Sequence, residues 1–133
     1  MIVVDASVWV SYYLPQDVNH NASQRWLTTQ LVNRRPLIGP ELLLPEVGGA
    51  ISRRIGETEA RQVLTDLQNI PVLALFELDE ELSRNAAELA IRLRLRGADA
   101  VYVALAEQLG IPIVTWDGEM ITRTGSLIQA HTP

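Results

Sequence analysis

The 133-residue sequence predicts an α/β fold built on a mostly parallel sheet of four or five strands. Short apolar runs that are rich in β-branched residues and lack polar alternation are typical of strands buried on both faces. Residues 2–4 and 113–115 are the clearest of these runs. Segments with the apolar spacing of helices separate them, and strands that alternate with helices form parallel sheets covered on both sides.

The amino-terminal half begins with the strand that leads to Asp5. Ser7 is a good N-cap for the helix that follows, and Pro15 closes that helix. Pro45 is compatible with the first turn of a later helix, where a backbone N–H is not needed. The pattern predicts, in order, a strand at 2–4, helices at 8–14 and 21–33, a strand at 37–38, and helices at 41–56 and 58–69.

Capping residues and glycines delimit the elements of the carboxyl-terminal half. Asp79 caps one helix, which ends at about Arg96 before Gly97. A further helix begins after Asp99 and ends at Gly110. The pattern predicts a strand at 72–76, helices at 79–96 and 100–109, a strand at 113–115, a turn at 117–118, a short helical turn at 119–123, and a last edge strand at 127–129.

The length and composition predict a single domain over residues 1–133. The chain contains no cysteine, which excludes disulfides, thiolate zinc sites and cysteine nucleophiles. The amino terminus lacks the basic region of a signal peptide, and no apolar run approaches the ~18 residues of a membrane span. We therefore expect a cytoplasmic protein that does not associate with a membrane.

The net charge of −5 is the excess of sixteen acids over eleven bases. Nucleic-acid binders are expected to be basic, but removing the four acids singled out below leaves the rest of the chain at −1. The overall charge therefore does not decide the class of ligand. All eleven basic residues are arginine, which favours bidentate contacts to phosphate, although genomic codon bias explains the same choice.

Four acidic residues lie after or inside apolar runs, namely Asp5, Glu46, Asp99 and Asp117. Moving an unpaired charge out of water costs several kcal/mol. At about 5 Å and an effective dielectric of about 20, each pair of carboxylates repels by roughly 3 kcal/mol, so only a divalent cation or an arginine would hold such a cluster together. We therefore expect a hard-metal site beyond the carboxyl ends of the strands, where ligands bind in such sheets.

Each acid also has a simpler explanation when taken alone. These are a turn residue for Asp5, a surface position for Glu46, a helix cap for Asp99 and an Asx-turn for Asp117. The separate explanations do not account for the joint placement of the four. The glycine pair 48–49 beside Glu46 moreover indicates close helix packing rather than open solvent.

Further polar residues are candidates for supporting roles. Ser7 and Thr115 would hydrogen-bond ligand carboxylates or metal-bound waters, although a helix cap and a strand residue are simpler roles for them. Glu119 is either a fifth carboxylate or a first-turn acid favoured by the helix dipole. His20 and His131 have polar surroundings and are expected to be solvent-exposed.

Several arginines are candidates for holding a polyanion near the acids. Arg53 is seven positions after Glu46 and so lies on nearly the same helix face. Arg92, Arg94 and Arg96 lead directly into Asp99. The preference of helix carboxyl ends for basic residues explains these positions equally well.

At this point the sequence resembles the PIN-domain nucleases, and more narrowly the small stand-alone VapC-type toxins. The resemblance rests on Ile-Val-Val-Asp-Ala-Ser at 2–7, Leu-Leu-Leu-Pro-Glu-Val at 42–47, Gly-Ala-Asp-Ala-Val-Tyr-Val-Ala-Leu-Ala at 97–106, Gly-Ile-Pro-Ile-Val-Thr at 110–115 and Trp-Asp-Gly at 116–118. Each segment alone is weak evidence for this family, but the order and spacing of the five segments together are fairly specific for it. Trp116 is a departure, because the family more often has a smaller aliphatic residue there.

The resemblance implies a three-layer α/β/α sandwich, a magnesium or manganese site, and endonucleolytic cleavage of RNA. It also implies a homodimer and an antitoxin partner that threads a segment across the acidic cleft. By matching position, the metal ligands are Asp5, Glu46, Asp99 and Asp117, with Ser7 and Thr115 as supporting groups.

Oxygen ligands suit Mg²⁺ or Mn²⁺, which keep several waters, and one such water would attack a phosphodiester in line. No histidine is placed as a general base, so activation of water would fall to the metal. The family implies products with a 5′-phosphate and a 3′-hydroxyl.

Other classes that share this architecture fit less well. A haloacid-dehalogenase-type phosphatase needs a second acid two positions after Asp5, where this chain has Ser7. A receiver domain needs a lysine, and dinucleotide and P-loop binders need a glycine-rich loop after the first strand; both are missing here. The alternative from another class is a catalytically silent PIN-like module that binds protein or RNA.

Overall fold

The computed structural model describes all 133 residues and contains one five-stranded sheet. The strands are β1 (Ile2–Val4), β2 (Leu37–Pro40), β3 (Leu73–Phe76), β4 (Ile113–Val114) and β5 (Ala130–His131), in the order β3-β2-β1-β4-β5. Every neighbouring pair is parallel, so the predicted sheet is confirmed and is parallel throughout.

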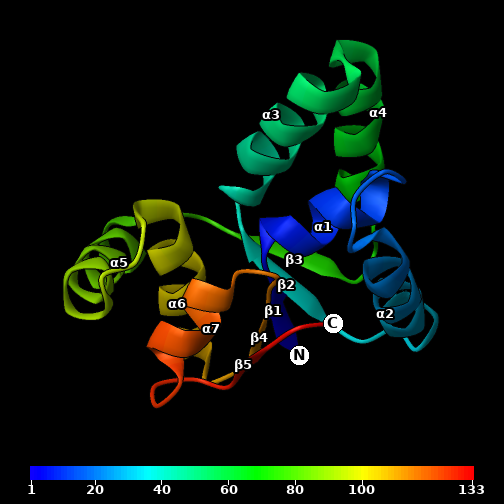
Figure 1. Ribbon diagram of the computed structural model, residues 1–133. Helices are drawn as coiled ribbons and strands as arrows, with labels where there is room; N and C mark the ends of the chain where they lie inside the picture. The colour runs from blue at the N-terminus through cyan, green and yellow to red at the C-terminus, as the bar shows by residue number, and fades with distance from the viewer.

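Helices cover both faces of the sheet, which makes the predicted three-layer sandwich (Figure 1). On one side lie α1 (Ala6–Tyr13), α2 (His20–Val32), α3 (Leu43–Ile55) and α4 (Glu57–Gln68). On the other side lie α5 (Glu80–Leu93), α6 (Gly97–Leu109) and α7 (Gly118–Thr124). None of these helices is long and apolar enough to cross a membrane.

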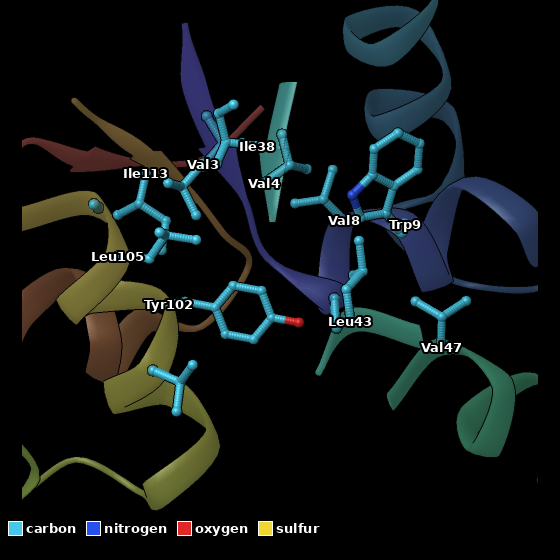
Figure 2. Close-up of a cluster of buried hydrophobic side chains, with 14 of the residues drawn as sticks. Val3, Val4, Val8, Trp9, Ile38, Leu43, Val47, Tyr102, Leu105 and Ile113 are labelled. Carbon is cyan, nitrogen blue, oxygen red and sulfur yellow. The ribbon is translucent and has the colours of Figure 1, made fainter. Parts of the chain in front are cut away.

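The hydrophobic core runs through all three layers. Figure 2 shows Tyr102 and Leu105 of α6 on one side of the strand residues, and Val8 and Trp9 of α1 on the other. All four side chains are essentially inaccessible to solvent. Full burial of a large apolar side chain contributes about 1.5–3 kcal/mol, so α1 and α6 are held firmly against the sheet from opposite faces. These two helices also carry residues of the acidic site.

The boundaries of several elements differ from prediction. Helix α1 begins at Ala6, because Asp5 and not Ser7 is its N-cap. Helix α5 ends at Leu93, since Arg94 adopts the left-handed conformation (φ 54°) that Gly97 was expected to supply. Gly97 instead opens α6, whose N-cap is Arg96. The predicted cap role of Asp99 is therefore wrong.

The last strand was predicted at 127–129 and lies at Ala130–His131. The backbone N–H groups of Leu127 and Ile128 both donate to the carbonyl of Thr124, so the chain continues to turn after α7. Pairing with β4 begins only where Ala130 lies opposite Ile113.

The expected close packing at the glycine pair occurs at Gly48 only. A Cβ atom on Gly48 would lie 3.0 Å from Leu64 Cδ1 of α4, whereas one on Gly49 would meet only the flexible Arg53 guanidinium of its own helix. Gly48 thus allows α3 and α4 to approach closely.

Candidate active site

The four predicted acids lie at the carboxyl end of the sheet, around its central strand. Asp5 follows β1, and Thr115 to Asp117 follow β4, which pairs with β1. Glu46 is in the first turn of α3, which follows β2, and Asp99 is in the first turn of α6. The chain places β2 and β4 on opposite sides of β1, so the acids surround the switch point where ligands bind in open α/β sheets.

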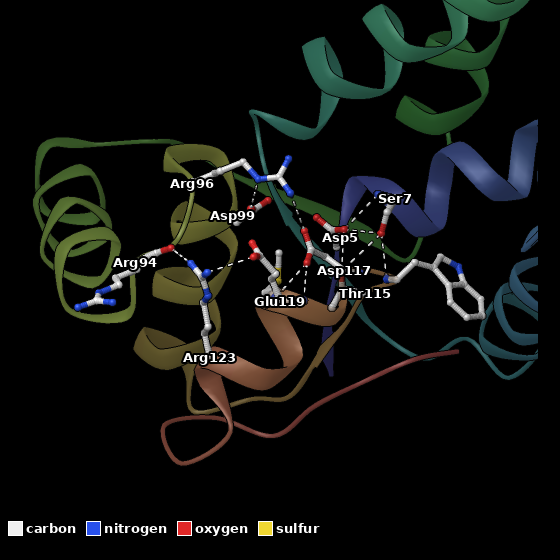
Figure 3. A network of polar contacts seen from close by, with 11 residues as sticks. Asp5, Ser7, Arg94, Arg96, Asp99, Thr115, Asp117, Glu119 and Arg123 are labelled. Atoms are coloured by element: carbon white, nitrogen blue, oxygen red, sulfur yellow. Dashed lines mark hydrogen bonds and ion pairs between the residues drawn. The ribbon is translucent and has the colours of Figure 1, made fainter.

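Asp5 is the most buried of the acids, with 6% of its surface exposed. Its Oδ2 atom accepts hydrogen bonds from the Ser7 backbone N–H (3.2 Å), the Ser7 hydroxyl (2.5 Å) and the Thr115 hydroxyl (2.9 Å). These bonds fix the carboxylate and also cap α1. Oδ1 takes part in none of the three, which leaves it as the atom best placed to face a cation (Figure 3).

The hydroxyls of Ser7 and Thr115 also hold the loop after β4. Trp116 donates its backbone N–H to Ser7 Oγ (3.0 Å), and Asp117 donates its backbone N–H to Thr115 Oγ1 (2.9 Å). Each hydroxyl therefore accepts from the loop and donates to Asp5. This arrangement agrees with the predicted supporting role of the two residues toward a carboxylate, and their relation to a metal stays a prediction.

Asp117 has two roles that divide between its oxygens. Oδ1 accepts from the backbone N–H groups of Glu119 (2.8 Å) and Met120 (3.0 Å), which caps α7. Oδ2 faces the site and lies 3.3 Å from Arg96 Nη2. The simple turn role and the site role are thus compatible in one side chain.

Glu46 is held by a residue that the sequence reasoning missed. The phenol of Tyr102, on α6, donates to Glu46 Oε2 at 2.6 Å. Tyr102 is 1% exposed. A tyrosine inside the apolar stretch 100–106 was the available signal, because a buried phenol requires a hydrogen-bond partner. Its partner, 56 positions away in the chain, could not be read from the sequence.

Arg96 lies between two of the acids, at 3.4 Å from Asp99 Oδ2 and 3.3 Å from Asp117 Oδ2 (Figure 3). Its side chain is 75% exposed, whereas each acid is 21% exposed. Exposed ion pairs contribute at most about 1 kcal/mol. Arg96 therefore supplies a weak, displaceable positive charge at the rim of the site.

Glu119 lies near Asp99, because its charge is one of the causes, after burial, that raise the pKa of Asp99. It lies in the first turn of α7, its side chain is 61% exposed, and it pairs with Arg123 at 3.1 Å. Arg123 also donates to the backbone carbonyl of Arg94. This geometry agrees with the role of a first-turn acid, and a role as a fifth carboxylate stays a prediction.

The acids perturb one another. Burial is the main cause that raises the pKa of Asp5, of Glu46 and of Asp99 above their ordinary values. The hydrogen bonds from Ser7 and Thr115 partly offset the rise at Asp5, and the Tyr102 phenol does so at Glu46. The charges of Asp5 and Asp99 raise the pKa of Glu46 further, and those of Asp117 and Asp5 raise the pKa of Asp99. Burial and the nearby Glu46 raise the pKa of Tyr102, so it remains a hydrogen-bond donor.

The donor set fits a hard divalent cation, which prefers carboxylate oxygens. Ionised carboxylates that are desolvated and repel one another are the electrostatic situation that such a cation relieves. As the side chains stand, however, no group of three or more Asp, Glu, His or Cys residues is arranged to hold a metal ion. The acids would therefore have to draw together around it, with Arg96 moving aside from Asp99 and Asp117.

The site is open rather than enclosed. None of the cavities in the protein is lined by any of the four acids. An open site at the carboxyl end of the sheet gives access to a long polymer, whereas a small metabolite is more often bound in an enclosed pocket.

The remaining arginine candidates are not brought to the acids by any contact within the chain. Arg53 on α3, Arg92 on α5 and Arg94 in the following turn are all exposed. Figure 3 shows the Arg94 side chain directed away from Asp5 and Asp99. Their predicted contact with RNA stays a prediction.

Neither histidine is fully exposed, so that expectation is wrong for both. His20 opens α2, and its Nδ1 lies 2.9 Å from the backbone carbonyl of Ser11 on α1. His131 is half-buried in β5, opposite Val114. Both residues lie at the end of a helix or strand, and their polar neighbours in the sequence therefore indicated a solvent-exposed position.

A protein-family model described as "PIN domain" matches residues 2–126. The chain belongs to the PIN-domain family. The family predicted from the sequence motifs is thus confirmed, and the match extends over nearly the whole chain.

The chain is also similar to individual proteins and solved structures. Ribonuclease VapC3 of Pyrobaculum aerophilum is 26% identical over 127 residues, which are 96% of this chain and 97% of the relative. VapC20 of Mycobacterium tuberculosis, described as a Sarcin-Ricin loop cleaving toxin, superposes with a TM-score of 0.81 at 20% identity over 92% of this chain and 94% of the other. VapBC2 of Rickettsia felis, bound to a fragment of promoter DNA, gives a TM-score of 0.75 at 14% identity over 100% of both chains. These two structural likenesses establish the PIN fold alone.

Proposed function

We propose that this PIN-domain protein is a divalent-metal-dependent endoribonuclease and the toxin of a type II toxin–antitoxin pair. The observation that carries the proposal is the placement of Asp5, Glu46 and Asp99 around the switch point of the sheet, where burial raises the pKa of all three and neighbouring acids raise those of Glu46 and Asp99 further. A protein gains no stability from such a cluster, so its presence indicates a ligand that compensates the charge.

The relatives support RNA as the substrate and a protein as the partner. One is named a ribonuclease, and another is described as a toxin that cleaves the Sarcin-Ricin loop. Two solved structures support an antitoxin partner for this chain, namely VapBC2 and FitAcB of Neisseria gonorrhoeae. FitAcB superposes with a TM-score of 0.75 at 16% identity over 100% of this chain and 98% of the other. A homodimer is part of the same proposal.

We assign a separate role to each group of residues in the site. Asp5, Glu46, Asp99 and Asp117 would hold Mg²⁺ or Mn²⁺, which when bound neutralises phosphate charge and lowers the pKa of an attacking water. Ser7 and Thr115 keep one oxygen of Asp5 engaged, and Tyr102 does the same for Glu46, so the free oxygens are oriented before substrate arrives. Arg96, once released from the acids, would contact a phosphate of the RNA.

The proposed reaction is hydrolysis at a phosphodiester. The water oxygen forms a bond to phosphorus, the bond from phosphorus to the 3′ oxygen breaks, and that oxygen leaves as a hydroxyl after taking up a proton. The products carry a 5′-phosphate and a 3′-hydroxyl. A 2′,3′-cyclic phosphate would instead require attack by the ribose hydroxyl, for which no histidine is placed among the acids as general base.

The test is cleavage of total RNA with Mn²⁺, repeated with a chelator and with Asp99→Asn. A matched control is Asp66→Asn, which changes an exposed aspartate on α4. We expect the chelator and Asp99→Asn to abolish cleavage and Asp66→Asn to leave it unchanged. Activity that survives both treatments, or cyclic phosphate ends, would overturn the proposed chemistry.

The silent-module alternative predicts a different result. It requires that the purified protein bind RNA or a protein with no cleavage under any metal condition. The toxin role is tested separately, because it predicts that a neighbouring reading frame encodes a DNA-binding protein that forms a complex with this chain and suppresses cleavage. Without such a partner the toxin role fails while the nuclease remains.

A further inference from the structure

The side chain of Trp116 makes a hydrogen bond to a residue outside the group formed by the four acids, Ser7 and Thr115. Its indole N–H donates to the hydroxyl of Ser23, on α2, at 2.8 Å. Trp116 immediately precedes Asp117 and follows Thr115, so it lies in the middle of the loop that carries two polar groups of the site. It is also the one position where the sequence departs from the resembling motifs.

The contact is the first member of a buried chain of hydrogen bonds. Ser23 Oγ lies 2.6 Å from Ser11 Oγ, and the Ser11 hydroxyl donates to the carbonyl of Val8 at 2.9 Å. Because Ser11 donates to Val8, Ser23 donates to Ser11 and its lone pairs are free to accept from Trp116. Ser11 and Ser23 are 1% and 0% exposed, so water cannot replace a missing partner in this chain.

Trp116 is thereby joined to α1 by two independent routes. Its backbone N–H reaches Ser7 in the first turn, and its indole reaches Ser11 through Ser23. Ser7 and Ser11 are four residues apart and lie on the same face of α1. His20 adds a further link between α2 and α1 through the carbonyl of Ser11. The loop is therefore fixed relative to the helix that Asp5 caps.

We propose that Trp116 is a positioning residue, whose indole bond to Ser23 holds Thr115 and Asp117 beside Asp5. The proposal rests on the proposed metal-dependent function of the acids. A smaller aliphatic residue at this position would leave Ser23 with no partner from the loop, and only the bonds to Ser7 and Asp5 would then join the loop to the start of α1. Trp116 thus gives this chain a side-chain anchor for Asp117.

The first arm of the test measures the loop in the metal-free protein by amide hydrogen exchange. The variants are Trp116→Phe and Ser23→Ala, which each remove one end of the bond. The matched control is Trp26→Phe, which shortens a half-buried tryptophan of α2 that is no member of this hydrogen-bond chain. We expect the amides of Trp116 and Asp117 to exchange about fivefold faster in both variants, as the loss of one hydrogen bond implies, and unchanged in the control. Unchanged exchange in both variants would overturn the proposal.

The second arm measures Mn²⁺ binding by electron paramagnetic resonance, which does not depend on RNA cleavage. We expect the dissociation constant to rise about fivefold in Trp116→Phe and in Ser23→Ala, and the double variant to bind no more weakly than either single one. Faster exchange with unchanged Mn²⁺ affinity would overturn the positioning role. Absence of Mn²⁺ binding in the wild-type protein would instead overturn the proposed function, while the exchange data would still decide whether Trp116 anchors the loop.

Discussion

Replacing Tyr102 by phenylalanine tests whether Glu46 is tuned by its hydrogen bond. The change removes only the phenol oxygen, which donates to Glu46 Oε2 at 2.6 Å, and keeps the ring in the core. The bond lowers the pKa of Glu46, whereas burial and the charges of Asp5 and Asp99 raise it. Without the bond, the factors that raise the pKa remain unopposed.

The magnitude follows from the type of bond. A hydrogen bond to a charged group contributes about 1.5–3 kcal/mol, and one pKa unit corresponds to about 1.4 kcal/mol. Glu46 is only half-buried, so water will replace part of the lost interaction and the lower end of this range applies. We therefore expect the pKa of Glu46 to rise by about one unit in Tyr102→Phe.

The assay is an NMR titration of the Glu46 side-chain carboxyl in the metal-free protein, combined with the pH profile of RNA cleavage. The acidic limb of the profile should move to higher pH by about the same amount, while the rate at high pH changes little. Tyr12→Phe is the control, because it removes a phenol on α1 and leaves the Glu46 partner in place. An unchanged Glu46 titration in Tyr102→Phe would refute the reasoning.

Three further predictions concern charge and packing. The folded-state pKa values of Asp5, Glu46 and Asp99 are raised, so the contribution of these groups to stability is lost as the pH rises above their ordinary pKa values of 3.8 and 4.5. The thermal midpoint of the metal-free protein should therefore be higher at pH 5 than at pH 8. Asp5→Asn should reduce that difference. In urea denaturation, Gly49→Ala should stabilise by about 0.5–1 kcal/mol, whereas Gly48→Ala should gain less or destabilise, since its Cβ would meet Leu64 at 3.0 Å; equal effects would contradict the packing described. Arg96→Gln should tighten Mn²⁺ binding at pH 7.5 by up to about fivefold in calorimetry, and weaker binding would show that Arg96 does not compete for the acids.

The sheet was predictable from the sequence because its first four strands contain short apolar runs. The runs at 2–4 and 113–115 lie at the centre of the sheet. Strands that are buried on both faces there are apolar throughout, which makes them easy to recognise in the sequence. The last strand was misplaced because residues 127–129 are no less apolar than Ala130–His131. Only the turn at Thr124 decides between them.

The acids themselves were found because a carboxylate inside or after an apolar run is anomalous in any fold. The hydroxyl partners of Asp5, Ser7 and Thr115, were also predicted, but the partners of Glu46 and Trp116 were not. Tyr102 reaches Glu46 from another helix, and Trp116 reaches Ser23 across 93 positions of the chain. Such contacts depend on how α6, and the loop after β4, pack against distant elements, which local patterns do not encode. The dual role of Asp5 as helix cap and site residue was also hidden, because Ser7 is an equally good cap by residue type.

The most direct test of whether the acids bind a common metal ion is the anomalous scattering of a crystal grown or soaked with Mn²⁺. We predict one strong peak between Asp5, Glu46 and Asp99, with carboxylate oxygens at about 2.0–2.3 Å from the ion and the Arg96 guanidinium withdrawn from the acids. The same crystal of Asp5→Asn should show a weaker peak or none. A Mn²⁺ peak elsewhere on the protein, with these carboxylates still apart and Arg96 still paired to Asp99 and Asp117, would contradict the account.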